Sequence, residues 1–149
     1  MTKTIGMIKN GINLDHIPKG NAWYIIKLLK LDNSKYPVGI GLNLISTKLG
    51  QKDLLKIENY KLSNRELELI SIFAFNATYS EIDDFQVIKK IILKLPDKID
   101  ELIICPNHRC ISHQYKSLFY LKQKHDELTA ECHYCTKSYN LTGLTNFKL

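Results

Sequence analysis

Apolar positions recur at helical spacing in two stretches of this 149-residue chain. In the first, "KGNAWYIIKLLKL" (19–31), an i, i+3, i+4, i+7 pattern is formed by Ala22, Ile25, Ile26 and Leu29. In the second, "SNRELELISIFAF" (63–75), one face is shared by Leu67, Ile70, Phe73 and Ala74. The second stretch also opens with Ser63 and Glu66 at the spacing of a capping box, which satisfies free N–H groups at a helix start. We therefore predict two amphipathic helices.

The segments around these helices read as extended chain. An apolar stretch, "IGMIKNGINLDHIPKG" (5–20), precedes the first helix, and "YPVGIGLNL" (36–44) and "KDLLKIENYKL" (52–62) form a predicted hairpin joined by "ISTKLGQ". After the second helix, "ATYSEIDDFQVIKKIILKL" (77–95) is rich in β-formers and is interrupted by the acidic turn "EIDD". The order β-α-β-β-α-β predicts an α+β fold: a ferredoxin-like split βαβ sandwich with two helices on one face of an antiparallel sheet.

The pattern breaks at "KLPDKIDE" (94–101), where Pro96 cannot donate to a strand ladder and charges lie on both sides. We place a domain boundary there, giving domains 1–97 and 98–149. In the second domain "LIICPNHRC" (102–110) and "ECHYCTKSYNL" (131–141) are short strand-like pieces separated by residues 111–130. A domain of this size with few large aliphatic side chains usually needs a covalent or metal staple.

All four cysteines of the chain fall in this second domain, and they form two pairs. The spacing is C-x4-C, then twenty-one residues, then C-x2-C, formed by Cys105, Cys110, Cys132 and Cys135. Two such pairs can converge on one tetrahedral Zn²⁺, and four thiolates leave no open position for water, so the site would be structural. His108 and His133 lie inside the pairs and could substitute as ligands. Two disulfides are the other alternative and require an oxidising compartment. We predict a small all-β domain of the zinc-ribbon, rubredoxin-like type.

Composition narrows the class of protein without choosing a function. With 44% apolar and 24% charged residues, the chain lies in the ordinary globular range. No apolar run is long enough to span a membrane and no secretory signal is present, so we expect a cytoplasmic protein. Of the net charge of +6, little lies in residues 99–149, which hold six basic and five acidic side chains. This favours a protein partner over nucleic acid, although a zinc-ribbon nucleic-acid-binding protein, supported by the pI of about 9.1, is the alternative.

Asp15 and His16 in "LDHIP" are the candidate chemistry of the first domain. Adjacent residues of a strand point to opposite faces, so we do not expect them to touch each other. No nucleophile motif or phosphate loop accompanies them, which argues against an enzyme. They are either a polar strand end without function or part of a nucleotide site. In the second case Lys56 and Lys90, on neighbouring strands, would face phosphates while the carboxylate takes a ribose hydroxyl.

Several motifs occur together in one order: "LDHIP", "IGLNL", "LGQKDLLKIEN", "LPDKIDELIICPN", "CISH" and "CHYC". With these, the chain resembles the regulatory chain of aspartate carbamoyltransferase along nearly its whole length. The resemblance implies a non-catalytic subunit for pyrimidine biosynthesis. Its N-terminal domain would pair with its twin and bind CTP, ATP or UTP, and its zinc domain would dock on the catalytic chain. Two catalytic trimers and three regulatory dimers would form a dodecamer.

The resemblance also assigns residues. The effector-contacting positions it implies are Ile8 with its neighbours Ile5 and Met7, Asp15, His16, Lys56, Val87 and Lys90. The zinc ligands it implies, for one ion per chain, are the four cysteines. The chain departs from the family where relatives commonly carry a basic residue after the second lysine: it has Ile92 there, and Lys89 precedes Lys90.

Overall fold

The computed structural model describes residues 6–125 and 127–149. The chain divides into two compact units, Met1–Lys94 and Leu95–Leu149, which we call the N-terminal and C-terminal units. In the part of the chain that is described, no helix is long and apolar enough to cross a membrane.

The N-terminal unit is a five-stranded sheet with two helices. Its elements are β1 (Gly11–Pro18), α1 (Ala22–Leu28), β2 (Val38–Ser46), β3 (Gly50–Glu58), α2 (Asn64–Phe73), β4 (Thr78–Asp83) and β5 (Gln86–Ile92). The strand order is β2-β3-β1-β4-β5, and each neighbouring pair is antiparallel. β1 and β2 therefore run parallel with β3 between them, which confirms the predicted split βαβ arrangement. β5 extends this pattern by one strand.

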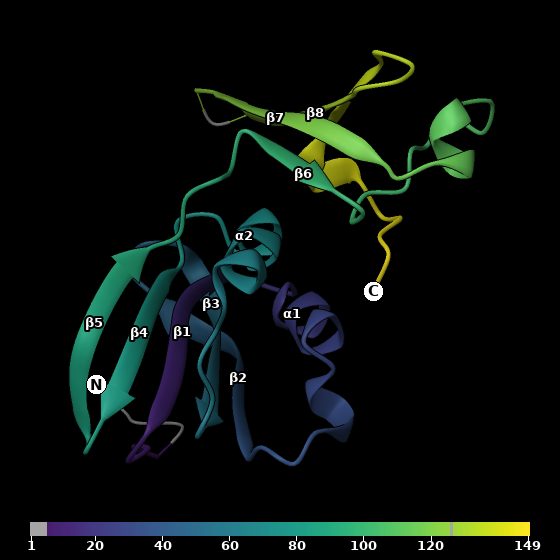
Figure 1. Ribbon diagram of the computed structural model, residues 1–149. Helices are drawn as coiled ribbons and strands as arrows, with labels where there is room; N and C mark the ends of the chain where they lie inside the picture. Colours follow the sequence, from purple (N-terminus) through teal and green to yellow (C-terminus); the bar gives the residue numbers. More distant parts are fainter. Residues whose placement is uncertain (1–5, 126) are drawn as a thin grey trace. The chain divides into compact units, whose positions relative to one another are not determined.

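Both helices cover the same face of the sheet (Figure 1). The core lies between the two helices and this face of the sheet. Its large, fully buried side chains are Ile12, Leu14, Ile17, Ile25, Leu55, Ile57, Ile70 and Tyr79. Burial of this apolar surface is the main stabilising contribution to the unit. Among the described residues no helix covers the opposite face, and we call it the open face.

The two helices start in different ways. In α2 the predicted capping box is present: the Ser63 hydroxyl accepts from the Glu66 N–H at 3.1 Å, and the Glu66 carboxylate accepts from the Ser63 N–H at 3.0 Å. In α1 the side chain of the N-cap residue, Asn21, forms no capping hydrogen bond, and the side chain of Asp53 in β3 substitutes for it. The buried Asp53 carboxylate accepts from the N–H groups of Gly20 at 2.9 Å and Ala22 at 3.3 Å. This long-range cap fixes the start of a seven-residue helix that is shorter than predicted.

Two sequence-based boundaries are wrong. The predicted loop 45–51 is mostly strand, because β2 continues to Ser46 and β3 begins at Gly50. The extended stretch after α2 is interrupted by a turn, as expected, and forms a hairpin of β4 and β5, but the turn is Asp84–Phe85 instead of residues 81–84. Both turn residues have left-handed φ values, 48° and 66°, which suit the twist of a two-residue hairpin. Most of the predicted acidic turn therefore belongs to β4.

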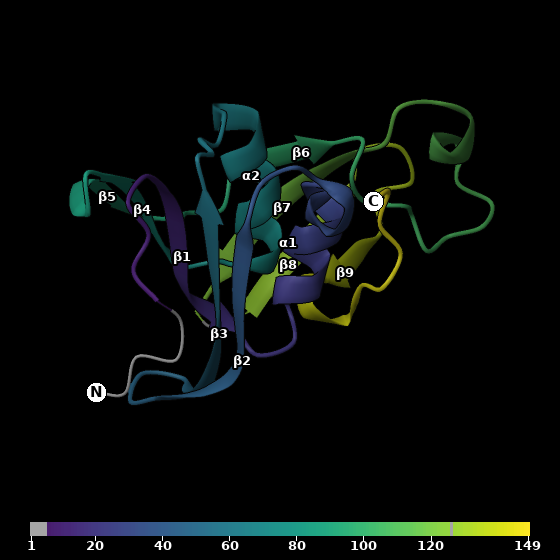
Figure 2. The same ribbon diagram turned by 90° about the horizontal axis from the view of Figure 1, so that it is seen from below.

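The C-terminal unit is a four-stranded antiparallel sheet of order β6-β7-β8-β9. Its strands are β6 (Lys98–Asp100), β7 (Leu118–Lys124), β8 (Glu127–Cys132) and β9 (Ser138–Asn140), the last labelled in Figure 2. β7 and most of β8 lie in the segment 111–130 that the sequence analysis left as a connection. The segment 102–110, expected to be strand-like, contributes only an isolated bridge between Ile103 and Phe147. The all-β character predicted for this unit is correct, but its strands lie elsewhere.

Candidate functional site

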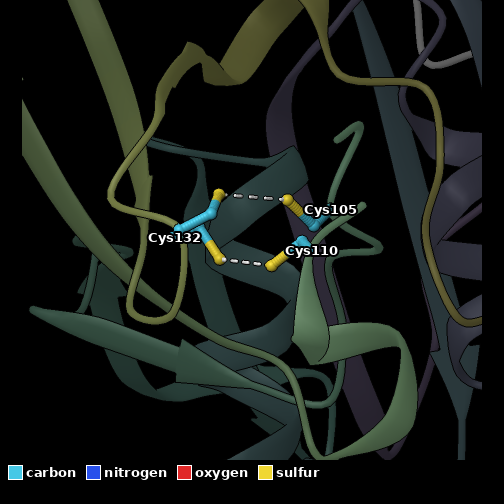
Figure 3. A group of neighbouring side chains, drawn as sticks. Cys105, Cys110 and Cys132 are labelled. Carbon is cyan, nitrogen blue, oxygen red and sulfur yellow. Dashed lines mark hydrogen bonds between the residues drawn. The ribbon is translucent and has the colours of Figure 1, made fainter. Parts of the chain in front are cut away.

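The four cysteines of the C-terminal unit form one compact cluster. Cys105 and Cys110 come from the loop after β6, Cys132 ends β8, and Cys135 follows in the turn before β9. Their sulfurs all lie within 4.8 Å of one another. The Sγ atoms of Cys105 and Cys135 are 3.8 Å apart. Those of Cys110 and Cys132, which are both labelled in Figure 3, are 3.6 Å apart.

These distances fit a tetrahedral metal ion. An ion with metal–sulfur bonds of about 2.3 Å places its four sulfurs about 3.8 Å from one another. A disulfide would bring two sulfurs to about 2.05 Å, and all four cysteines are free thiols, so the disulfide alternative is wrong. Among the described residues the cluster contains no histidine. His133 instead has its Nδ1 atom 2.7 Å from the Tyr120 hydroxyl.

The cysteines of the cluster differ in their thiol pKa values. Burial raises the pKa of Cys132 to about 12. Burial acts in the same direction on Cys110, but hydrogen bonds from the Ser112 hydroxyl and N–H outweigh it and lower the pKa of Cys110 to about 6. The Ser112 N–H lies 3.4 Å from that sulfur. Four crowded thiolates repel one another unless a metal ion offsets their charge, and such a complete shell is typical of a structural site.

In the N-terminal unit, two of the predicted site residues lie in one row across the open face. The register pairs Lys56 of β3 with Asn13 of β1, Asn13 with Ser80 of β4, and Ser80 with Lys90 of β5. The prediction that Lys56 and Lys90 are on neighbouring strands is wrong, because β1 and β4 lie between β3 and β5. Adjacent strands are about 4.8 Å apart, so the two lysines are separated by about 14 Å along this row. Both side chains can therefore approach a ligand that lies over Asn13 and Ser80.

An irregularity in β5 puts Val87 on the same face as Lys90. They are three positions apart along β5, with two residues between them, and in a regular strand this spacing places side chains on opposite faces. The register shift next to Ile82 pairs Val87 with Ile82 and Lys89 with Glu81, which leaves Ile88 as the extra residue. Val87 and Lys90 then share the open face. Lys89 points to the helical face, where its ammonium lies 3.9 Å from Glu81.

A second irregularity changes the expectation for Asp15 and His16. Leu14 and Ile17 are both fully buried in the core, so the two residues between them lie together on the other side. His16 adopts a left-handed φ of 60°, and its N–H donates to Asp15 Oδ1 at 2.7 Å. The His16 Nδ1 atom lies 4.0 Å from the same oxygen. The prediction that the two side chains stay apart is wrong, because it assumed a regular strand.

The predicted contact at the start of the chain is partly described. Ile8 is buried, with 8% of its surface exposed, whereas Met7 is 59% exposed. The Lys56 ammonium donates to the Gly6 carbonyl at 3.1 Å, so the segment before β1 lies next to the Lys56 side chain. Ile5 lies outside the described residues.

Comparisons with known proteins agree with this architecture. The family description "Aspartate carbamoyltransferase regulatory chain, allosteric domain" matches residues 3–94, and "Aspartate carbamoyltransferase regulatory chain, metal binding domain" matches residues 97–143. The chain belongs to the aspartate carbamoyltransferase regulatory chain family. The regulatory chain of Chromobacterium violaceum is 40% identical over 141 residues, 93% of each chain. Those of Vibrio cholerae and Klebsiella pneumoniae are 42% and 40% identical over 87% and 89% of this chain, and 85% and 88% of theirs.

Membership in the regulatory chain family explains the absence of catalytic motifs, because the regulatory chain is the non-catalytic partner of a catalytic chain in pyrimidine biosynthesis. The allosteric family domain coincides with the N-terminal unit. The metal-binding family domain covers all four clustered cysteines.

Two residues of the open face in this regulatory chain were not predicted from the sequence. Lys52 of β3 forms a 2.7 Å ion pair with Asp15 Oδ1. The Oδ1 atom of Asn13 is buried and has no hydrogen-bond partner among the described residues. The same is true of the Nδ1 atom of His16. The period of two in β3 could have revealed Lys52, because it lies four residues before Lys56 and shares its face. Nothing in the sequence marks Asn13 without the strand register.

Proposed function

We propose that the open face of the N-terminal unit binds the nucleotides CTP, ATP and UTP as allosteric effectors of aspartate carbamoyltransferase. The observation that supports this most directly is the single row that contains Lys56 and Lys90, with Asp15 and His16 beside it on the same face. Ammonium groups at two ends of a row suit a phosphate chain. A helix-free sheet face leaves room for the rest of the ligand.

The rows of the open face suggest how a nucleotide lies on it. Val87, Ile82 and the nearby Ile8 offer an apolar environment for a base. Asn13 and Asp15 are two residues apart, about 7 Å along the strand, and offer oxygen acceptors for ribose hydroxyls. The phosphates then contact Lys56, Lys90 and His16. Ile92 pairs with Thr78 beside this site and adds no charge to it.

Two adjacent lysines give a matched test of this site. Lys90→Gln should weaken CTP, ATP or UTP binding in calorimetric titrations of the chain by about tenfold or more, because a hydrogen bond to a charged group contributes about 1.5–3 kcal/mol. Lys89→Gln removes the same charge from the helical face and should leave affinity near the wild-type value. Equal effects of the two substitutions would contradict the proposed face, and no binding by the wild-type chain would contradict nucleotide effectors.

We also infer that the metal is one structural Zn²⁺ per chain. Thiolates select Zn²⁺ over the hard cations Mg²⁺ and Ca²⁺, and a closed four-thiolate shell is its usual structural site. Thiols of this kind stay reduced and metal-bound in the cytoplasm, which is the compartment we propose. Native mass spectrometry with elemental analysis checks the identity of the metal. Iron in the purified chain at one equivalent, with no zinc, would contradict this assignment.

The C-terminal unit supports docking on the catalytic chain through an exposed apolar surface. Ile111 and Tyr115 follow Cys110 in the chain, Tyr134 lies between Cys132 and Cys135, and the three side chains are 51%, 60% and 37% exposed. The two tyrosine rings stack with centroids 6.4 Å apart, and the Tyr134 hydroxyl donates to the Lys116 carbonyl at 3.0 Å. Rigid, half-exposed aromatic side chains are typical anchors of protein interfaces. Tyr115→Ser should therefore weaken assembly with the catalytic chain in co-expression, measured by the mass of the complex.

The N-terminal unit would pair with a second copy through its β2 edge. β2 is an edge strand, and Ile45 on it is 91% exposed, with Ile40 and Leu42 also exposed. An exposed apolar edge favours addition of another strand. The other edge, β5, carries Val87 and Lys90 of the ligand face. Ile45→Lys should turn dimers of the isolated chain into monomers. If Ile45→Lys leaves the dimer unchanged and Ile88→Lys dissociates it, pairing takes place through β5 instead.

Such pairing and docking would complete a dodecamer of two catalytic trimers and three regulatory dimers. Effectors would then act by favouring different quaternary states of the complex, with a coupling free energy of about 1–3 kcal/mol. Co-expression with the catalytic chain, followed by measurement of assembly mass and nucleotide response, tests this mechanism. Assembly without any change in activity on adding nucleotides would contradict it.

A further inference from the structure

The Tyr139 hydroxyl lies beside one thiol of the metal cluster. Tyr139 is the central residue of β9 and pairs with Ala130 of β8, so the sheet fixes its position. Its oxygen is 3.8 Å from the Sγ atom of Cys105. The phenol therefore reaches the cluster from a strand that provides no metal ligand.

The cluster is less enclosed on this side. Cys105, Cys110 and Cys132 are buried, whereas Cys135 has intermediate exposure. Cys105 and Cys135 form one of the close sulfur pairs, at 3.8 Å, so Cys105 lies next to the most exposed cysteine of the cluster. A group that stabilises the Cys105 thiolate therefore acts on the ligand beside Cys135.

We propose that Tyr139 is a positioning residue of the metal centre, whose O–H donates a hydrogen bond to the Cys105 thiolate. This hydrogen bond slows the loss of the metal and the attack of external reagents on the cysteine sulfurs at this side of the cluster. Four thiolates around a divalent cation leave excess negative charge on sulfur. A hydrogen bond to an ionised acceptor is stronger than a neutral one, and second-shell donors of this kind orient the ligand and retain the metal.

The test compares the metal-loaded chain with two variants that keep the ring. Tyr139→Phe should transfer zinc to the chelator 4-(2-pyridylazo)resorcinol about tenfold faster than wild type, the lower end of the usual effect of losing a second-shell partner. Tyr120→Phe, which loses a hydroxyl bonded to His133 rather than to a ligand, should leave the rate unchanged. Replacing Tyr139 by 3-fluorotyrosine, a stronger donor, should slow the transfer.

Two further readouts separate hydrogen bonding from packing. Alkylation by iodoacetamide, mapped by peptide mass, should increase at Cys105 relative to Cys110 in Tyr139→Phe. With Co²⁺ in place of zinc, the sulfur-to-metal charge-transfer band should move to lower energy in that variant, because an unbonded thiolate is easier to oxidise. Unchanged transfer rate, alkylation pattern and absorption would overturn the proposal, as would an equal change in Tyr120→Phe. If Tyr139→Phe does not fold, the fluorotyrosine result decides, and faster or unchanged transfer there overturns the proposal.

Discussion

The Lys52 ammonium and the Asp15 carboxylate form a 2.7 Å ion pair beside the irregularity in β1. The same carboxylate oxygen accepts the His16 N–H. Asp15 is therefore held by a neighbouring strand as well as by its own. This arrangement links the position of His16, in its left-handed conformation, to Lys52, a residue outside the "LDHIP" motif.

Lys52→Gln should weaken nucleotide binding by about tenfold, because it removes a positive charge from the open face and frees the Asp15 carboxylate. Calorimetric titration with CTP and ATP measures the change. Lys19→Gln is a suitable control, since the Lys19 ammonium donates to the Gln51 side chain at an exposed position. Wild-type affinity in Lys52→Gln would show that the ion pair has no role in ligand binding.

Asn13 should give effects of opposite sign on stability and on binding. Its buried Oδ1 atom has no partner among the described residues, and such an atom costs about 1–3 kcal/mol of stability. Asn13→Leu should therefore raise the free energy of unfolding and weaken nucleotide binding. Denaturant titration and calorimetry on the same preparation measure both quantities. Lower stability in Asn13→Leu, or unchanged affinity, would contradict this interpretation of the row.

The sequence predicted the order of elements well where local chemistry decides it. The capping box of α2 is visible as Ser63 and Glu66, and the two helices and the split βαβ order follow from periodicity. The start of α1 could not be predicted, because its cap comes from Asp53, more than thirty residues away in sequence. Strands β7 and β8 were not predicted, although Phe119 and Leu121 alternate with more exposed neighbours, because this alternation stops after Leu121 and the last three residues of β7 are polar and exposed.

The candidate sites also could be predicted from the sequence only where local spacing decides the structure. The cysteine cluster follows directly from spacing, because two short pairs of thiols can converge in few ways. The face shared by Asp15 and His16, or by Val87 and Lys90, depends on an extra residue in each strand. A strand irregularity of this kind reverses the alternation of side chains and leaves no clear signal in sequence.

The buried Asp53 carboxylate should be important for the stability of the N-terminal unit. It accepts from the N–H groups of Gly20 and Ala22 and, at 3.2 Å, from that of Asn43 at the irregularity in β2. Asp53→Ala leaves these donors unpaired and should lower the free energy of unfolding by about 2–4 kcal/mol. The exposed Asp32→Ala should change it by less than about 0.5 kcal/mol. Urea unfolding followed by circular dichroism distinguishes the two.

Metal removal should unfold one unit and spare the other. The metal shell is built from residues 105–135 of the C-terminal unit, and binding free energies of structural zinc in small domains are about 10–16 kcal/mol, largely expressed as folding. The N-terminal unit has its own core, with fully buried Ile12, Leu55 and Ile70, and needs no metal. After chelation, amide hydrogen exchange should become fast in residues 95–149 and stay slow in β1, β3 and α2. Cys110→Ser should reproduce this pattern without chelator, and slow exchange in both units of the metal-free chain would contradict a folding role for the metal.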